Sequence, residues 1–161
     1  MQTLPELLQQ VQTTMTPPNT DLSNFIDNQV GKGKTILITG ASSGLGAGMA
    51  THFARMGYNL AICARNEENL KSLKKELETK YNGIQVLIKS TDISKRKDVL
   101  AFAEAALKMF GSIDVLINNG GIFLSGSTCE ENEGTLEKLI ETNLYSAYHL
   151  TRAIVPFMTS S

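Results

Sequence analysis

The 161 residues correspond to one domain of ordinary globular composition, with 42% hydrophobic and 19% charged residues. Fifteen basic residues nearly balance sixteen acidic ones, so the net charge of −1 gives no electrostatic basis for binding nucleic acid. No apolar run approaches the roughly 18 residues that a membrane-spanning helix needs. The composition therefore excludes disordered, fibrous and membrane-spanning classes of protein.

Cysteine and histidine are too sparse for a disulfide framework or a metal centre. Cys63 and Cys129 cannot supply a four-ligand zinc site, and His52 and His149 are isolated in the sequence. We interpret both cysteines as free thiols in a reducing compartment. Because the first lysine is Lys32, the chain begins without the basic segment of a signal peptide. The sequence thus predicts a cytoplasmic protein without a metal or a membrane partner.

Residues 1–33 form an N-terminal arm that differs in composition from the rest of the chain. Apolar residues recur at helical spacing over residues 4–15, and Pro17-Pro18 follows them. A helix this short needs a surface on which to pack. Two interpretations stay open: a mobile arm, or an arm that docks on the domain or on a partner. Gly31-Lys32-Gly33 marks the boundary with a domain over residues 34–161.

After the arm, four short apolar runs alternate with four segments of helical periodicity. The expected strands cover residues 35–39, 58–63, 84–89 and 113–117, and the expected helices cover 45–56, 67–81, 99–110 and 136–154. Asn66 is an expected N-cap, and Gly57 and Gly111 are expected helix stops. Because the runs are apolar on both faces, they predict a parallel sheet covered by helices on both sides, which is an α/β fold.

A glycine-rich turn joins the first expected strand directly to the first helix. It runs Thr39-Gly40-Ala41-Ser42-Ser43-Gly44-Leu45-Gly46. At such a junction the unpaired N–H groups and the dipole of the helix favour an anion, and glycines let a pyrophosphate approach the backbone. The turn therefore predicts a dinucleotide phosphate site. The alternative is a tight strand-to-helix turn with only a packing role.

Several motifs, in this order, resemble those of the short-chain dehydrogenases/reductases. TGASSGLG at residues 39–46 resembles the TGxxxGxG signature of that family, and Asn118-Asn119-Gly120-Gly121 is similar to its NNAG motif, with glycine in place of alanine. Asp92-Ile93 resembles the pair whose carboxylate meets the adenine, Asn143 matches the asparagine of the catalytic tetrad, and Pro156-x-Met158 resembles the end of the same helix. The resemblance covers residues 34–158. It implies a Rossmann-type, doubly wound parallel sheet with the strand order 3-2-1-4.

The end of the second expected strand indicates which nucleotide is bound. An acid at this point accepts the ribose 2′-hydroxyl of NAD, but here Ala64 is followed by Arg65. A guanidinium can hold a 2′-phosphate bidentately, with serine hydroxyls of the turn as further donors; the alternative is a solvated surface arginine. We therefore expect NADP(H). The resemblance and this strand end together give the expected cofactor-binding residues: Gly40, Ser42, Ser43, Gly44, Leu45, Gly46, Arg65, Asp92, Ile93, Asn119, Gly120 and Gly121.

The groups that transfer the proton in that family have no counterpart among the 161 residues. The family uses a tyrosine with a lysine four residues later, beside a serine that holds the substrate carbonyl, and none of the four tyrosines here has such a lysine. We therefore expect a truncated, N-terminal cofactor-binding part that is inactive by itself. Asn143 remains, and we expect its amide to be buried and to hold a water for a proton relay. The alternative for Asn143 is a polar residue that bends the helix.

The resemblance implies an NADP(H)-dependent oxidoreductase of the short-chain type. Hydride would pass between the nicotinamide and a carbonyl or alcohol group of a small-molecule substrate. The alternative is a non-catalytic NADP-binding or regulatory module. The resemblance also implies a homo-oligomer that uses the fourth helix.

Overall fold

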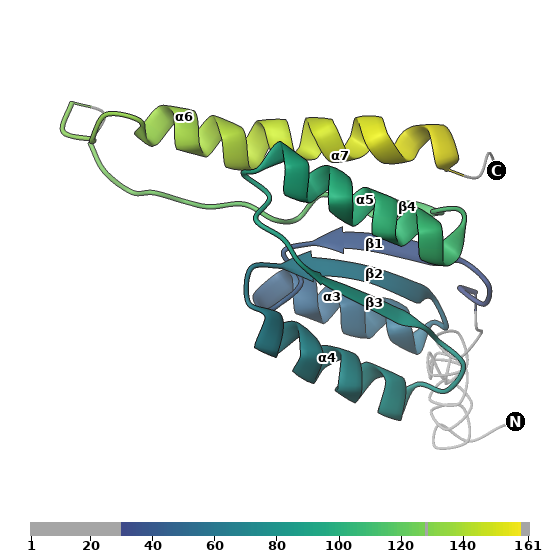
Figure 1. Ribbon diagram of the computed structural model, residues 1–161. Coiled ribbons are helices and arrows are strands. Elements are labelled where there is room, and N and C mark those ends of the chain that lie inside the picture. Colours follow the sequence, from purple (N-terminus) through teal and green to yellow (C-terminus); the bar gives the residue numbers. More distant parts are fainter. Residues whose placement is uncertain (1–29, 128, 159–161) are drawn as a thin grey trace, which may run out of the picture.

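The computed structural model describes residues 30–127 and 129–158, which form a sheet with helices on both faces (Figure 1). The strands are β1 (Thr35–Thr39), β2 (Asn59–Ala64), β3 (Val86–Ser90) and β4 (Val115–Ile117). The helical elements are α3 (Gly44–Arg55), α4 (Glu67–Lys80), α5 (Arg96–Phe110), α6 (Thr135–Ile140), the π-helical turn η1 (Glu141–Tyr145), α7 (Ser146–Ile154) and the 3₁₀ turn η2 (Val155–Phe157). The helix expected over residues 4–15 lies outside the described residues.

All strand pairs are parallel, and their order β3-β2-β1-β4 confirms the predicted Rossmann-type arrangement. β1 pairs with β2 on one side and with β4 on the other, and each of its residues is buried. A strand that is covered on both faces has to be apolar throughout, which explains the run Ile36-Leu37-Ile38. Because parallel strands end at one edge of the sheet, the segments that follow them meet there.

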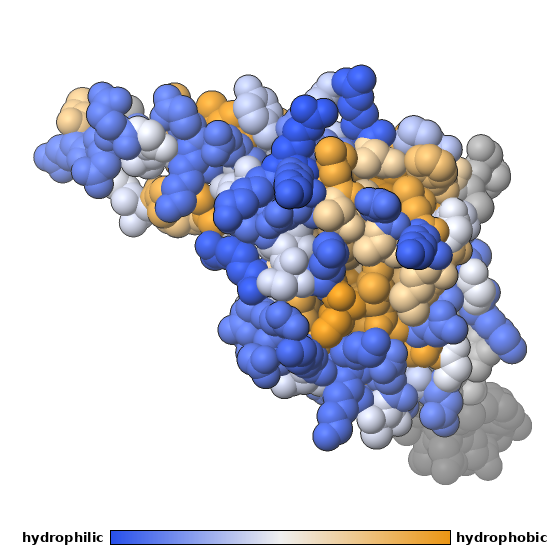
Figure 2. Space-filling view, viewed as in Figure 1, coloured by the Kyte–Doolittle hydropathy of each residue, from blue (hydrophilic) through white to orange (hydrophobic). Residues whose placement is uncertain are grey.

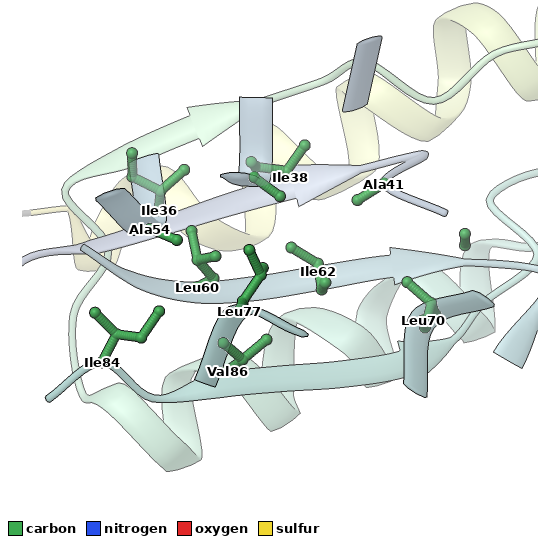
Figure 3. Close-up of a cluster of buried hydrophobic side chains, with 12 residues drawn as sticks. Ile36, Ile38, Ala41, Ala54, Leu60, Ile62, Leu70, Leu77, Ile84 and Val86 are labelled. Atoms are coloured by element: carbon green, nitrogen blue, oxygen red, sulfur yellow. The ribbon is translucent and has the colours of Figure 1, made fainter. Parts of the chain in front are cut away.

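Two hydrophobic cores cover the two faces of the sheet. Figure 3 shows the core between the sheet and the helices α3 and α4, which contains Ile36, Ile38, Ala54, Leu60, Ile62, Leu70 and Leu77. On the other face α5 and α7 cover the sheet, and that core contains Leu37, Ala61, Cys63, Phe102, Leu150 and Ile154. Neighbouring residues of β1 and β2 thus point to opposite cores, as the pleat of a strand requires.

α4 begins at its predicted N-cap, and α3 and α5 end at their predicted glycine stops, but α5 begins at Arg96, three residues before the predicted start at residue 99. Oδ1 of Asn66 accepts a hydrogen bond from the N–H of Asn69 at 3.0 Å, which confirms the N-cap of α4. Gly57 and Gly111, which follow α3 and α5, have φ values of 85° and 77°. Since side chains disfavour this left-handed backbone, the glycines allow the chain to leave each helix.

Two strands begin two residues later than predicted, where side chains bond to the backbone at the amino edge of the sheet. β4 begins at Val115 and not at Ile113; Oδ2 of the intervening Asp114 accepts a hydrogen bond from the N–H of Thr35 at 2.8 Å. β3 begins at Val86; the N–H of the preceding Gln85 donates to Oδ1 of Asn59 at 2.9 Å. Hydrophobic periodicity carries no information about such bonds.

The prediction of one uninterrupted fourth helix is wrong, because a π-helical turn separates α6 from α7. The N–H of Ser146 donates to the carbonyl of Glu141, five residues earlier, and the carbonyl of Thr142 thereby loses its α-helical donor. The hydroxyl of Ser146 donates to this carbonyl instead, at 2.5 Å. The wider turn is tolerated because the buried carbonyl keeps a donor.

The surface of α4 is charged, whereas another part of the same face of the molecule is apolar. Figure 2 shows hydrophilic residues over α4, along which Lys74 pairs with Glu78 at 3.6 Å, and hydrophobic residues between α5 and β3.

Within the described ranges, no helix has both the length and the apolar character needed to cross a bilayer.

Candidate functional site

The glycine-rich turn lies at the carboxyl edge of the sheet, between β1 and α3. Gly40 and Gly44 have φ values of 69° and 57°, in the left-handed region that favours glycine. Ser43 precedes α3 without a capping bond from its side chain, and the first turn of α3 carries no acidic residue. The N-terminal N–H groups of α3 therefore face no acidic side chain of that turn, which favours an anion at this end.

Asn119, which follows β4, connects its loop to this turn through hydrogen bonds of its side chain and backbone. Its Nδ2 donates to the carbonyl oxygens of Thr39 and Gly40, at 3.0 and 3.2 Å. In return, Oγ1 of Thr39 accepts from the N–H groups of Asn119 and Gly120, at 3.1 and 2.9 Å. A Cβ at Gly40 would lie 2.7 Å from the Cα of Gly120, so the two backbone segments are closer than any side chain at residue 40 permits.

The end of β2 presents a cation that no acid of the described chain neutralises. Arg65 is exposed, and within residues 30–127 and 129–158 its guanidinium takes part in no ion pair. Glu67 and Glu68, which follow it, both contact Nζ of Lys71, at 3.0 and 3.5 Å, and these contacts raise the pKa of Lys71, with the hydrogen bond to Glu67 as the largest cause. An anion near Arg65 would thus meet a free guanidinium.

The segment after β3 supplies an ionised carboxylate. Oδ1 of Asp92 accepts hydrogen bonds from Oγ of Ser94 at 2.7 Å and from its N–H at 3.2 Å. The hydroxyl bond to Ser94 is the main cause that lowers the pKa of Asp92, and Nζ of Lys95, 3.6 Å from Oδ2, acts in the same direction. The N–H of Thr91 donates to the carbonyl of Ala64 at 2.9 Å, which places this segment beside the end of β2.

These segments surround a cleft of about 610 Å³, a volume typical of small-molecule sites. The structure brings together eight of the predicted residues along its walls: Gly40, Ser42, Ser43, Arg65, Asp92, Ile93, Gly120 and Gly121. The sequence motifs do not indicate the other lining residues as site residues: Ala64, Asn66, Thr91, Ser94, Ile122, Lys138 and Thr142. Most of these adjoin predicted residues, but Lys138 and Thr142 come from the fourth helical segment. Their spacing of four residues, one helical turn, is the only signal of them in the sequence.

Four further predicted residues adjoin the cleft without lining it: Gly44, Leu45, Gly46 and Asn119. Leu45 is exposed and Gly46 is buried. A Cβ at Gly46 would lie 2.3 Å from the carbonyl oxygen of Gly40 and 2.7 Å from Nδ2 of Asn119. Gly46 therefore lets α3 pack against the turn.

Asn143 is exposed, so the predicted burial of its amide is wrong, although the amide does have partners. Its Nδ2 donates to the carbonyl of Ile122 and its Oδ1 accepts from the N–H of Ile122, both at 2.8 Å. The side chain thus pairs with a surface loop and not with the core. Each amide atom can form one further hydrogen bond, and the water-holding role stays a prediction.

Both cysteines are free thiols, as predicted, and Cys63 lies buried in β2. Burial raises the pKa of Cys63 to about 12, so it is protonated near neutral pH and is a poor nucleophile. In the part of the chain that the structure describes, His, Cys, Asp and Glu side chains form no group of three that could hold a metal ion.

A family model described as short chain dehydrogenase matches residues 34–161. Among curated proteins, the NADP-dependent 3-hydroxy acid dehydrogenase of Schizosaccharomyces pombe is 38% identical over 130 residues. That match covers 80% of this chain and 50% of the relative, so the chain spans half of the relative's length.

Solved structures share the fold over most of the chain. An alcohol dehydrogenase from the archaeon Thermococcus sibiricus, complexed with 5-hydroxy-NADP, has a TM-score of 0.74 and 33% identity over 77% of this chain and 52% of its own. The L-sorbose reductase of Gluconobacter frateurii, complexed with NADPH and L-sorbose, has a TM-score of 0.77 and 30% identity over 81% of this chain and 49% of its own.

Proposed function

Because the chain belongs to the short-chain dehydrogenase family, we propose that its cleft binds NADP(H). The whole protein would be an oxidoreductase that transfers hydride between the nicotinamide and a carbonyl or alcohol group of a small-molecule substrate. The names of the relatives support this proposal: one is NADP-dependent, and two structures are complexes with NADPH or an NADP derivative. Family membership favours this function over a non-catalytic or regulatory module.

The single observation that carries the choice of NADP(H) is the environment of Arg65. Arg65 lines the cleft, its guanidinium has no ion-pair partner among the described residues, and the nearest acids in the sequence are bound to Lys71. A 2′-phosphate would supply the missing partner through charge-assisted hydrogen bonds. The 2′-hydroxyl of NAD prefers an acid, but Ala64 stands at the strand end.

The other predicted residues fit further parts of the nucleotide. We assign the pyrophosphate to the turn at residues 40–46, where the backbone and the serine hydroxyls offer donors, and the adenine to Asp92 and Ile93. Asn119 would fix the turn, and Gly120 and Gly121 would lie along the opposite wall, beside the nucleotide. Asn143 would act as a positioning residue for Ile122, which lines the cleft.

The bound cofactor would supply the hydride, and the protein would have to move a proton. The 161 residues contain no tyrosine with a lysine four positions later. We therefore propose that these residues form the cofactor-binding part and show no turnover by themselves. General acid–base groups typically contribute about 10²–10⁴-fold to a rate, so their absence would slow any turnover by at least about 100-fold.

Titration of the full chain with NADPH and with NADH tests the cofactor assignment. Arg65→Asp should weaken NADPH binding at least about tenfold, the equivalent of 1.4 kcal/mol, and should leave NADH binding almost unchanged. Arg55→Asp is the matched control, because it makes the same change of charge at an exposed residue of α3 outside the cleft. Equal affinity for both nucleotides, unaffected by Arg65→Asp, would contradict the assignment.

We also propose a second copy of the chain as the partner of α7. The exposed side chains of Leu144, Tyr148 and Val155 border an apolar groove of about 540 Å³. Sedimentation should therefore show an associated species that Val155→Lys dissociates. A monomer in the unaltered chain would contradict this partner.

A further inference from the structure

Gly120 and Ile93 contact each other across the carboxyl edge of the sheet. Gly120 follows β4 and Ile93 follows β3, the two outer strands of the described sheet, and both residues line the cleft. A Cβ at Gly120 would lie 2.7 Å from Cδ1 of Ile93, well inside the contact distance of two carbon atoms. The terminal methyl group of Ile93 therefore fills the space that a side chain at residue 120 would take.

Gly120 cannot move away from this contact without breaking other bonds. Its N–H donates to Oγ1 of Thr39 at 2.9 Å, and a Cβ would also lie 3.2 Å from that oxygen and 3.3 Å from the backbone nitrogen of Gly40. The flexible end of Ile93 is thus the group that has to yield. Because Ile93 packs against the core between the sheet and α5, it would be displaced toward the cleft.

We propose that Gly120 and Ile93 form a matched pair that sets the space for the adenine ring in the cleft. The absence of a Cβ at residue 120 lets Ile93 withdraw from the cleft, and its side chain then offers an apolar surface to a purine. Asp92, held ionised beside it, is an acceptor suited to the exocyclic amine of adenine. This inference rests on the proposed function, since it takes an adenine nucleotide as the ligand.

The pair also gives a physical reason for the glycine that stands where the NNAG motif has alanine. Valine at residue 93, which lacks the Cδ1 methyl group, would accommodate alanine at residue 120 without displacement of its side chain. Alanine with isoleucine is the combination that crowds the adenine space.

A double-mutant cycle on the full chain tests the pair, with 2′,5′-ADP as a probe that has the adenosine half and no nicotinamide. Gly120→Ala should weaken binding of 2′,5′-ADP and of NADPH at least about fivefold, because overpacking displaces Ile93. Ile93→Val alone should change both affinities by less than about twofold, and in the Gly120→Ala background it should restore them. Gly126→Ala is the control, because a Cβ there meets nothing within 4 Å and the residue lies outside the cleft.

Two outcomes would overturn the pair: no effect of Gly120→Ala, or a loss that Ile93→Val does not rescue, so that the effects of the two substitutions are additive. The last would trace the loss to the hydrogen bond with Thr39. If far-UV circular dichroism shows that Gly120→Ala is unfolded, Ile93→Ala replaces it and should weaken 2′,5′-ADP binding; unchanged binding would overturn the proposal. Failure of the unaltered chain to bind either nucleotide refutes the proposed function itself, whereas failure of the pair leaves that binding intact.

Discussion

The amide of Asn143 pairs with the backbone of Ile122 through two hydrogen bonds of 2.8 Å, one in each direction. Asn143→Ala removes both bonds and releases the loop at a residue that lines the cleft. We expect the free energy of unfolding to fall by about 1–2 kcal/mol, measured by urea denaturation, since each such bond contributes roughly 0.5–1.5 kcal/mol. The affinity for NADPH should fall severalfold.

Asn143→Asp separates the two bonds. The carboxylate can still accept from the N–H of Ile122 but cannot donate to its carbonyl. At neutral pH the negative charge also faces the carbonyl oxygen of Ile122 and repels it. The losses of stability and of NADPH affinity should therefore at least equal those of the alanine variant at neutral pH, and they should diminish in acid. Unchanged stability and NADPH affinity in both variants would show that the pairing has no influence on the cleft.

Ser146→Ala tests the substitute donor in the π-helical turn. The variant leaves the buried carbonyl of Thr142 without the hydroxyl that donates to it, and an unsatisfied buried group costs about 1–3 kcal/mol. Ser72→Ala, at an exposed position of α4, is the matched control and should be neutral or slightly stabilising, because alanine is the better helix former. Denaturation curves of the two variants that coincide would contradict the role of the hydroxyl.

Gly46→Ala and Gly48→Ala, two residues apart on α3, should have opposite effects. A Cβ at Gly46 would lie 2.3 Å from the carbonyl oxygen of Gly40, whereas a Cβ at Gly48 meets nothing within 4 Å. The first substitution should destabilise the protein by about 1–3 kcal/mol and abolish nucleotide binding. Gly46→Val should destabilise the protein further, because its side chain is larger. The second should stabilise the helix by up to about 1 kcal/mol. Thermal denaturation and NADPH titration compare the Gly46→Ala and Gly48→Ala variants. Equal melting temperatures of these two variants would refute the steric argument.

The ionised state of Asp92 should make stability depend on pH in acid. The pKa of Asp92 is lowered in the fold, so ionisation stabilises the native state above the ordinary pKa of 3.8, and this contribution is lost as the pH falls through the lower native pKa. Asp92→Asn should therefore narrow the difference in stability between about pH 5 and pH 3. Ser94→Ala, which removes the main cause of the shift, should narrow it in the same way. Urea denaturation across this range provides the measurement, and parallel curves for all three proteins would contradict the prediction.

The fold could be predicted where local signals and burial coincide. β1 is apolar because helices cover both faces of the sheet at this strand, and Asn66 caps α4 through a bond within the same turn, so both are visible in the sequence. The start of β4 could not be predicted, because hydrophobic periodicity carries no information about contacts such as the bond between Asp114 and Thr35, 79 residues apart. The same reason accounts for β3, whose preceding residue bonds to Asn59.

The candidate site was predictable from motifs that lie at strand ends, but not from contacts between them. Arg65 follows a buried strand and so had to lie at the carboxyl edge of the sheet. Lys138 lines the cleft only because its helix extends past the end of the sheet, as Figure 1 shows for α6. Asn143 was expected in the core because the helical period was assumed to continue through it, and the π-helical turn breaks that period.

The π-helical turn also changes the angular phase of the helix that contains it. An α-helix advances about 100° per residue, so over the twelve residues from Lys138 to Leu150 an uninterrupted helix would turn the second side chain about 120° away from the first. The turn absorbs roughly one residue, which reduces the offset to about 20°. The helical segment from α6 to α7 can therefore use one side for both contacts. This side faces the cleft at Lys138 and Thr142 and the core at Leu150. Deleting a single residue from 141–145 would leave eleven residues, which keep the offset of about 20° in a regular α-helix, so both faces should stay aligned. Regular α-helical geometry without that deletion would instead return the offset to about 120°, and the helix could then face either the cleft or the core with this side, but not both.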